Sequence, residues 1–222
     1  MNRSLLSAAA AAALIVGCTA SEATVPTSAT DGPSAPVSDP QPATPVVPAG
    51  GEASTPDSPA TWGESRCAPP SGKTAGLKIG DQLAELTLKD CDGNDYALTK
   101  TCGASATWLF VAHGWCPHCK VVSKDSASIV AGYAGKNVAA INILIENGQS
   151  KPPTAADCKA WRDSNKLANV IALYDPKGVS QGLFEEGTTS LNVFISEDRI
   201  IRSKAHTDVT GDITEGIDGA LK

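Results

Sequence analysis

The sequence WLFVAHGWCPHC, residues 108–119, decides the fold that we expect. Its first part, 108–112, is entirely apolar, and a short run of this kind is typical of a buried strand. Pro117 suits the first turn of a helix, where its missing N–H would have no partner anyway. We expect this helix to continue to about Tyr133. The stretch therefore predicts a strand, a sharp turn and a helix, with a Cys-x-x-Cys pair where the helix begins.

Cys116 and Cys119 have the spacing that thiol–disulfide exchange requires. Unpaired N–H groups and the helix dipole favour the thiolate form of an exposed Cys116. Cys119 follows one turn later, shielded, and can resolve the mixed disulfide that attack by Cys116 creates. Pro117 and His118 are expected to tune the acidity of Cys116, His118 by bringing positive or donor character within reach of the sulfur. We predict this pair as the catalytic dithiol, without cofactor or metal.

Strand and helix signals alternate along the rest of the domain, which we place at residues 63–222. The sequence predicts strands at 83–89, 96–98, 108–112, 138–145, 170–174, 191–195 and 200–203, and helices at 117–133, 154–165, 176–187 and 212–221. The turn at 91–94 makes the first two strands a hairpin. Alternating elements favour an α/β fold, a three-layer α/β/α sandwich around a largely parallel sheet.

The pentapeptide WCPHC after a hydrophobic strand resembles the active site of the thioredoxin superfamily. Its Pro117-His118 dipeptide is similar to that of the periplasmic DsbA oxidases. The hairpin before the strand, and the inserted helix and strand at 154–174, instead resemble the TlpA/AhpC-type redoxins. The resemblance covers about residues 76–222. It implies a thioredoxin-like sandwich with an N-terminal β-hairpin and a central helix–strand insertion.

The sequence departs from the patterns of these related proteins at several positions. The place of the usual cis-proline falls at Thr189 and Ser190, and we expect a trans loop because a non-proline cis bond costs about 3 kcal/mol. This loop and Trp115 are expected beside the site. The acid common three residues beyond the second cysteine is Val122, so a reductant role that relies on it is not supported. His113 stands where peroxiredoxins carry threonine, which argues against peroxidase chemistry.

The N-terminus has the pattern of an export signal. Arg3 precedes an apolar run, 5–16, that is shorter than the roughly 20 residues of a membrane span. The run ends at Cys18 in a sequence that resembles the bacterial lipobox. We expect residues 1–17 to be a lipoprotein signal peptide and Cys18 to be lipidated, with an ordinary signal peptide as the alternative. Residues 18–62 are rich in Pro, Ala and Thr and predict a disordered tether.

Four further cysteines form an even set in a chain that we expect to be exported, which favours structural disulfides over redox sites or metal ligands. We prefer a Cys91–Cys102 bond, because the hairpin turn could return the chain. The pairing of Cys67 and Cys158 stays open, since four cysteines allow three pairings. His113 and His206 could join the Cys-x-x-Cys pair in holding copper or zinc. The set comprises Cys67, Cys91, Cys102 and Cys158.

The charge of the domain is nearly balanced, with 17 basic and 19 acidic residues after Gly63. This gives no basic footprint for nucleic acid. We expect a thiol–disulfide oxidoreductase whose partners are protein thiols or disulfides and an unidentified redox protein. The expected protein is a monomer anchored by lipid and facing the periplasm, with the outer membrane slightly favoured because Thr19 follows Cys18. A copper-handling lipoprotein of the same fold is the alternative.

Overall fold

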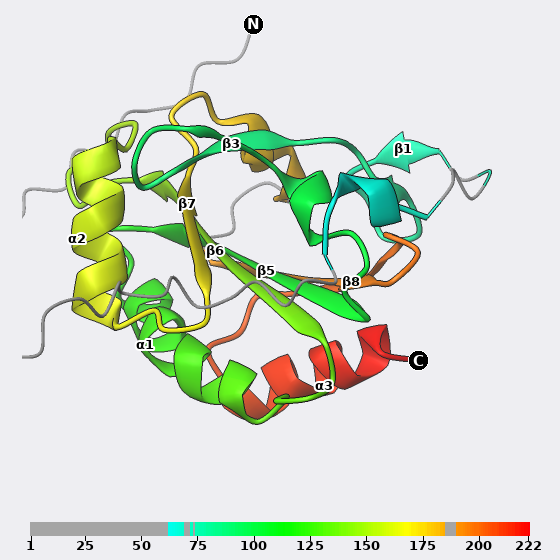
Figure 1. The fold of residues 1–222 in the computed structure, drawn as a ribbon. Helices are drawn as coiled ribbons and strands as arrows, with labels where there is room; N and C mark the ends of the chain where they lie inside the picture. Colours follow the sequence, from blue (N-terminus) through cyan, green and yellow to red (C-terminus); the bar gives the residue numbers. More distant parts are fainter. Residues whose placement is uncertain (1–61, 69–71, 73, 185–189) are drawn as a thin grey trace, which may run out of the picture. The chain divides into compact units, whose positions relative to one another are not determined.

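The computed structural model describes residues 62–68, 72, 74–184 and 190–222 (Figure 1). The predicted signal peptide, Cys18, the tether up to residue 61 and Thr189 lie outside the described residues. The elements are η1 (Glu64–Arg66), β1 (Ala75–Gly76), β2 (Gln82–Leu83), β3 (Thr87–Asp90), β4 (Asp95–Ala97), η2 (Leu98–Thr101), β5 (Ala106–His113), α1 (Pro117–Ala131), β6 (Val138–Glu146), α2 (Ala155–Asn165), β7 (Ile171–Tyr174), η3 (Val179–Leu183), β8 (Leu191–Ser196), β9 (Ile201–Ala205) and α3 (Thr210–Ala220).

Seven strands of the described domain form one sheet, in the order β4-β3-β7-β6-β5-β8-β9. β6 lies between β5 and β7 and is parallel to both, whereas β8 pairs antiparallel with β5. β5 is buried along its whole length up to His113, and β6 up to Glu146. Continuous burial of this kind is typical of central strands that are covered on both faces. The two strands therefore form the rigid centre of the sheet and end at the same edge.

The two faces of the sheet are covered differently (Figure 1). Helices α1 and α3 and the buried side of α2 cover one face, where they pack on Trp108 and Phe110 of β5. The segment from β2 to β3, together with η2 and η3, covers the other face against Leu109 and Val111. Successive β5 side chains point to opposite faces, so the one apolar run supplies both halves of the core. The predicted α/β architecture is confirmed.

Two elements differ from the sequence-based prediction. The strand expected at 83–89 is divided, because β2 pairs with β1 while β3 belongs to the main sheet. The helix expected at 176–187 is replaced by the short 3-10 helix η3, Val179–Leu183. Oδ2 of Asp175 accepts hydrogen bonds from both the N–H and the hydroxyl of Ser180, at 2.7 and 2.6 Å. These bonds hold the chain in a tight turn at the start of η3.

The inserted helix α2 begins where the sequence predicts. Oγ1 of Thr154 accepts a hydrogen bond from the N–H of Asp157 at 3.3 Å, and the Asp157 carboxylate accepts one from the Thr154 N–H at 2.9 Å. This reciprocal pair is a capping box, which satisfies two backbone donors at once. The helix ends at Asn165, and the positive φ of 53° at the next residue, Lys166, reverses the chain towards β7.

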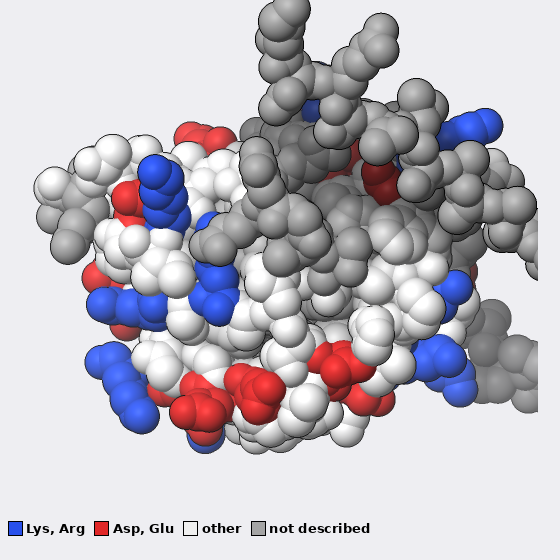
Figure 2. Space-filling view, turned by 180° about the vertical axis from the view of Figure 1, so that it is seen from behind, with Lys and Arg blue, Asp and Glu red and all other residues white. Residues whose placement is uncertain are grey.

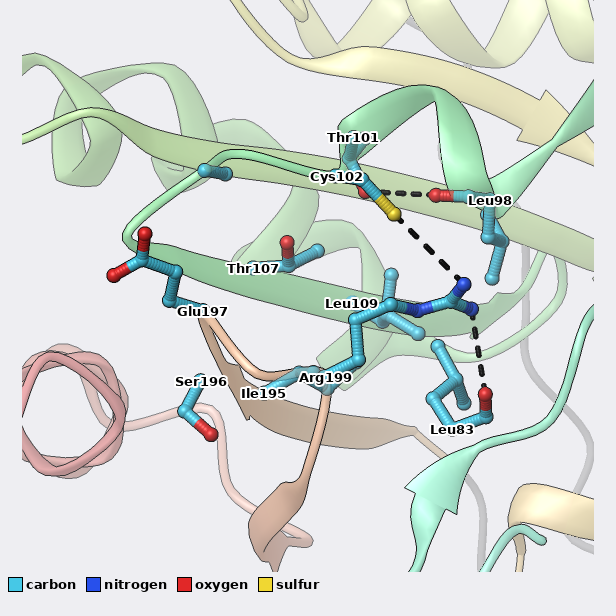
Figure 3. A pocket seen from close by; sticks show the side chains of 11 residues that line it. Leu83, Leu98, Thr101, Cys102, Thr107, Leu109, Ile195, Ser196, Glu197 and Arg199 are labelled. Atoms are coloured by element: carbon cyan, nitrogen blue, oxygen red, sulfur yellow. Dashed lines mark hydrogen bonds between the residues drawn. The ribbon is translucent and has the colours of Figure 1, made fainter. Parts of the chain in front are cut away.

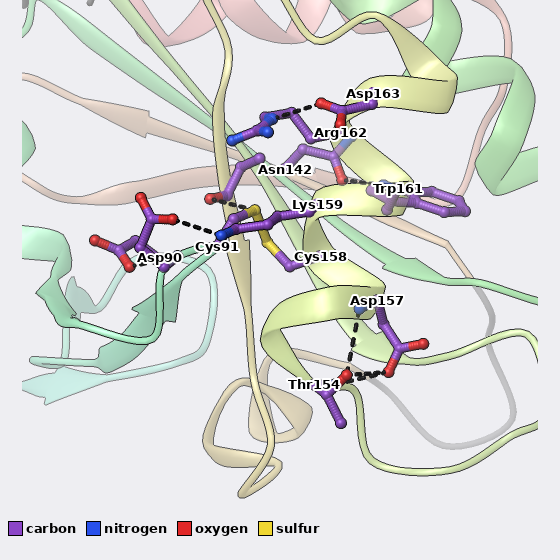
Figure 4. Close-up of a disulfide and its surroundings, with 12 residues drawn as sticks. Asp90, Cys91, Asn142, Thr154, Asp157, Cys158, Lys159, Trp161, Arg162 and Asp163 are labelled. Carbon is purple, nitrogen blue, oxygen red and sulfur yellow. Dashed lines mark hydrogen bonds and ion pairs between the residues drawn. A yellow bond between two sulfur atoms is a disulfide. The ribbon is translucent and has the colours of Figure 1, made fainter.

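The predicted Cys91–Cys102 bond is wrong, because the structure pairs Cys67 with Cys102 and Cys91 with Cys158. Cys91 lies in the turn of the β3–β4 hairpin, whereas the chain runs back along β4 and through η2 before it reaches Cys102. That return carries Cys102 away from the turn. Its sulfur faces Arg199 instead (Figure 3). Cys91 is bonded to α2 through Cys158 (Figure 4).

The described surface carries both signs of charge. Figure 2 shows Lys and Arg interspersed with Asp and Glu over the described part of one face. Among residues 62–68, 72, 74–184 and 190–222, none of the helices combines the length and the apolar character needed to cross a membrane.

Candidate active site

The active-site turn is held between the ends of β5 and β6. The N–H of Gly114 donates to the Glu146 carbonyl at 2.8 Å, and the N–H of Cys116 donates to the His113 carbonyl at 3.1 Å. A Cβ at Gly114 would lie only 2.8 Å from the carbonyl carbon of Asn147. Only glycine therefore lets the turn approach the neighbouring strand this closely. The turn fixes Cys116 at the start of α1.

Cys116 is the N-cap of α1, and its sulfur turns back over the first turn of the helix. Sγ of Cys116 accepts a hydrogen bond from the N–H of Cys119 at 3.3 Å. Pro117 occupies the first turn, as predicted. A side-chain acceptor at this position satisfies one of the orphan donors of the helix, and the dipole favours negative charge on it. The arrangement places the Cys116 sulfur as a hydrogen-bond acceptor at the N-terminus of α1.

Both active-site cysteines are free thiols and both are buried. Cys119 is 0% exposed, and burial raises the pKa of its thiol above the ordinary range, with the adjacent Cys116 acting in the same direction. This agrees with a shielded resolving cysteine. Cys116 is only 2% exposed, whereas we expected an exposed sulfur. Its inward turn towards the Cys119 N–H accounts for the difference.

His118 points away from the dithiol. Its Nδ1 lies 2.6 Å from Oδ2 of Asp208, which stands just before α3. This contact lowers the pKa of the Asp208 carboxyl. The contact expected between the His118 ring and the Cys116 sulfur is absent from the described hydrogen bonds, since the carboxylate is a stronger partner for the imidazole. Sequence reasoning missed Asp208, which lies 90 residues away.

The rings of Trp115 and His113 pack against each other beside the turn. The Trp115 indole is 39% exposed and donates from Nε1 to Oε2 of Glu146 at 2.6 Å. Its ring centroid lies 5.1 Å from that of His113, whose other neighbour is Phe184 at 5.7 Å. Burial lowers the pKa of His113, against the opposing charge of Glu146. The sequence analysis also missed Glu146. It lies at the end of β6, the parallel neighbour of β5, and residues at the ends of adjacent parallel strands lie close together.

A buried amide lies between β6 and the helices α1 and α2. Val122, at the position of the acid common in related redoxins, is buried. Nδ2 of Asn142 donates to Oγ of Ser123 at 2.9 Å, and Oδ1 of Asn142 accepts from the Trp161 indole at 3.1 Å. These bonds connect β6 with α1 and α2, so the network fixes the active-site helix on the sheet.

The loop before β8 is described only from Ser190 onward. Ser190 is buried, has a positive φ of 62°, and accepts from Nδ1 of His206 at 2.7 Å. No peptide bond within the described residues is cis. His206 is thus engaged by a backbone carbonyl, while Nδ1 of His113 is buried without a hydrogen-bond partner. The described residues contain no group of three or more His, Cys, Asp or Glu side chains arranged to hold a metal ion.

A groove of about 470 Å³ adjoins the active-site turn. Gly114 lies at its rim, Lys120 and Lys124 of α1 line one side, and Trp161 and Asn165 of α2 line the other. The groove is large enough to receive side chains of another polypeptide.

These features define the class of protein: an α/β redoxin whose dithiol caps the helix that follows a central strand. The sequence matches the model of the AhpC/TSA family over residues 79–204, and the chain belongs to this family. Among curated proteins, no sequence matches the chain significantly.

Solved structures share the fold at low sequence identity. A hypothetical protein from Sinorhizobium meliloti is 17% identical, with a TM-score of 0.57, over 67% of this chain and 87% of that one. A putative thiol:disulfide interchange protein DsbE from Chlorobium tepidum is 16% identical, with a TM-score of 0.54, over 66% and 100%. A putative protein disulfide isomerase from Bacteroides thetaiotaomicron is 16% identical, with a TM-score of 0.53, over 67% and 94%. These likenesses confirm the thioredoxin-like fold.

Proposed function

We propose that this redoxin catalyses thiol–disulfide exchange on exported proteins, with Cys116 as the nucleophile and Cys119 as the resolving thiol. The observation that carries the proposal is the hydrogen bond from the Cys119 N–H to the Cys116 sulfur at the N-terminus of α1. It places the Cys116 sulfur at the start of the helix, next to the backbone of the second thiol residue. The solved structures named for disulfide interchange and isomerisation have the same fold and support the proposal.

The exchange proceeds through a mixed disulfide. The Cys116 thiolate attacks one sulfur of a substrate disulfide, and the other substrate sulfur leaves as a thiolate that takes up a proton. Cys119 then loses its proton and attacks Cys116, which releases the second substrate thiol and leaves Cys116–Cys119 oxidised. The reverse sequence oxidises a substrate dithiol. The buried, protonated state of Cys119 keeps it out of the first step.

A turnover assay distinguishes a thiol–disulfide oxidoreductase from a protein that has the fold but no exchange activity. The Cys116→Ser variant is expected to lose both reduction of insulin disulfides and oxidation of a reduced protein substrate. The Cys91→Ala/Cys158→Ala variant, which removes a disulfide but keeps the Cys116–Cys119 pair, serves as the control and is assayed at a temperature where it is folded. Undiminished turnover in Cys116→Ser would contradict the proposal.

We further propose that the protein works outside the cytoplasm, anchored through a lipidated Cys18. The two disulfides of the domain support an oxidising compartment. The lipobox-like sequence that ends at Cys18 supports the anchor. Mass spectrometry of the mature protein should find acyl chains on Cys18, and Cys18→Ala should give soluble or unprocessed protein. A mature N-terminus elsewhere, without acyl chains, would contradict the anchor.

A further inference from the structure

The two disulfides of the domain have different access to solvent. Cys91 and Cys158 are 4% and 1% exposed and belong to the apolar cluster beneath the helices. Cys102 is likewise buried at 3%, but its partner Cys67 is only half-buried, next to the short helix η1. Among the four disulfide cysteines, Cys67 is the least buried residue, which favours attack by an external thiol at this position.

A cation contacts both sulfurs of the accessible disulfide. Arg199, in the turn between β8 and β9, places Nη1 at 3.9 Å from Sγ of Cys67 and at 3.8 Å from Sγ of Cys102. Its Nη2 donates to the Leu83 carbonyl at 3.3 Å, which fixes the guanidinium in this position (Figure 3). A guanidinium beside a sulfur stabilises the thiolate that forms when the bond breaks, and a better-stabilised thiolate leaves faster.

The buried disulfide has no such partner among the described hydrogen bonds and ion pairs. The basic residue next to it in sequence, Lys159, pairs instead with the Asp92 carboxylate at 2.8 Å. The two bonds therefore differ both in access and in the stabilisation of a leaving thiolate. Cys91–Cys158 provides an internal control for the behaviour of Cys67–Cys102.

A small cavity lies where a released thiolate would form. Cys102, Thr101 and Arg199 are among its lining residues, and its volume of about 10 Å³ is roughly that needed to hold one water molecule. Cys102 and Arg199 therefore border the same small space (Figure 3).

We propose that Cys67–Cys102 is a second thiol–disulfide exchange site, at which an external dithiol reduces the bond with assistance from Arg199. One thiolate of the dithiol attacks Sγ of Cys67, and the S–S bond to Cys102 breaks. Cys102 leaves as a thiolate beside Arg199. The second thiol of the dithiol then attacks the dithiol sulfur that is bonded to Cys67. This step releases Cys67 as a thiol and closes a disulfide within the dithiol. Two electrons pass to the protein, and the two protons of the dithiol end on Cys67 and Cys102.

This site is separate from Cys116–Cys119. Cys102 precedes β5 and Cys116 follows it, and the strand runs from Ala106 to His113. At about 3.3 Å per residue, the strand alone separates the two sites by roughly 23 Å. The dithiol of the same molecule therefore cannot reach Cys67, and the inference does not depend on the function proposed for Cys116 and Cys119.

Noncovalent contacts also join η1 to η2. The N–H of Gly63 donates to the Cys102 carbonyl at 2.9 Å, and the hydroxyl of Thr99 donates to the Glu64 carboxylate at 3.4 Å. The disulfide is therefore not the sole link between these two segments.

The test measures the rate at which each disulfide is reduced by dithiothreitol. The full chain is used with Cys116→Ser and Cys119→Ser, so that the other dithiol takes no part. Samples are quenched with one isotopic form of N-ethylmaleimide, fully reduced, labelled with a second form and mapped by mass spectrometry. We expect Cys67–Cys102 to be reduced at least about tenfold faster than Cys91–Cys158.

Two arginine variants test the role of the cation. Arg199→Gln should slow the reduction of Cys67–Cys102 by roughly tenfold and leave Cys91–Cys158 unchanged, whereas Arg199→Lys should retain most of the rate. Arg202→Gln is the matched control, because Arg202 binds Ser196 and Asp198 and contacts neither sulfur. Equal reduction rates of the two disulfides, or an unchanged rate in a folded Arg199→Gln, would overturn the proposal. If Arg199→Gln does not fold, the comparison of the two disulfides in the parent chain decides the question.

Discussion

Removal of the Cys91–Cys158 bond should strongly destabilise the domain. The bond joins the turn of the β3–β4 hairpin to α2 and closes a loop with a sequence separation of 67 residues. The chain-entropy relation, with this loop length, gives about 4 kcal/mol at 25 °C. We therefore expect Cys91→Ala/Cys158→Ala to lose about 4 kcal/mol of unfolding free energy, chiefly because its unfolded chain is less restricted.

The assay is urea unfolding at pH 7, followed by circular dichroism, with the free energy extrapolated to water. The matched control is Lys159→Gln, which breaks the exposed ion pair between Lys159 and Asp92 at the same contact. An exposed pair contributes only about 0–1 kcal/mol, so the control should unfold close to the wild type. A loss below about 1 kcal/mol in the double alanine variant would refute the reasoning, as would recovery of a Cys91–Cys102 bond by peptide mapping.

Three further changes test local features. Thr154→Ala should cost about 1 kcal/mol in urea unfolding because it removes half of the capping box with Asp157; an unchanged midpoint would contradict that role. Gly114→Ala should lower both turnover and stability, because the new Cβ would lie 2.8 Å from the backbone of Asn147; wild-type turnover would show that the turn has room. Asp208→Asn tests the contact with His118. The folded pKa of Asp208 is lowered, so its carboxylate stabilises the fold above its unfolded pKa, about 3.9, and loses that effect as pH falls through the folded value. The urea midpoint of wild type should therefore exceed that of Asp208→Asn at pH 7 and approach it in acid, and a difference that does not vary with pH would count against the contact.

Local signals predicted the elements that position the dithiol. The apolar run that became β5, Pro117 in the first turn of α1 and Thr154 as the N-cap of α2 each depend on neighbours within a few residues. These elements can therefore be predicted from the sequence. The burial of β6 on both faces follows from its continuous β-branched and apolar composition in the same way.

Contacts between distant segments were not predictable in this way. The disulfide pairing depends on how far the chain travels between Cys91 and Cys102, and the turn signal alone does not give that distance. The partner of His118 depends on where Asp208 stands in the folded chain, 90 residues later. The burial of Cys116 depends on the direction in which its sulfur turns at the helix terminus. Each of these outcomes is set by tertiary packing and not by local propensity.

The most direct test of the central claim is the capture of a mixed disulfide on Cys116. The full chain carrying Cys119→Ser, with its active-site thiol reduced, is incubated with a protein disulfide, and the adduct is located by non-reducing peptide mapping. We expect a stable adduct on Cys116, because the resolving thiol is absent, and none at the active site of Cys116→Ser. An adduct on Cys119 in the Cys116→Ser variant, or no adduct on Cys116 in Cys119→Ser, would contradict the assignment of the two thiols.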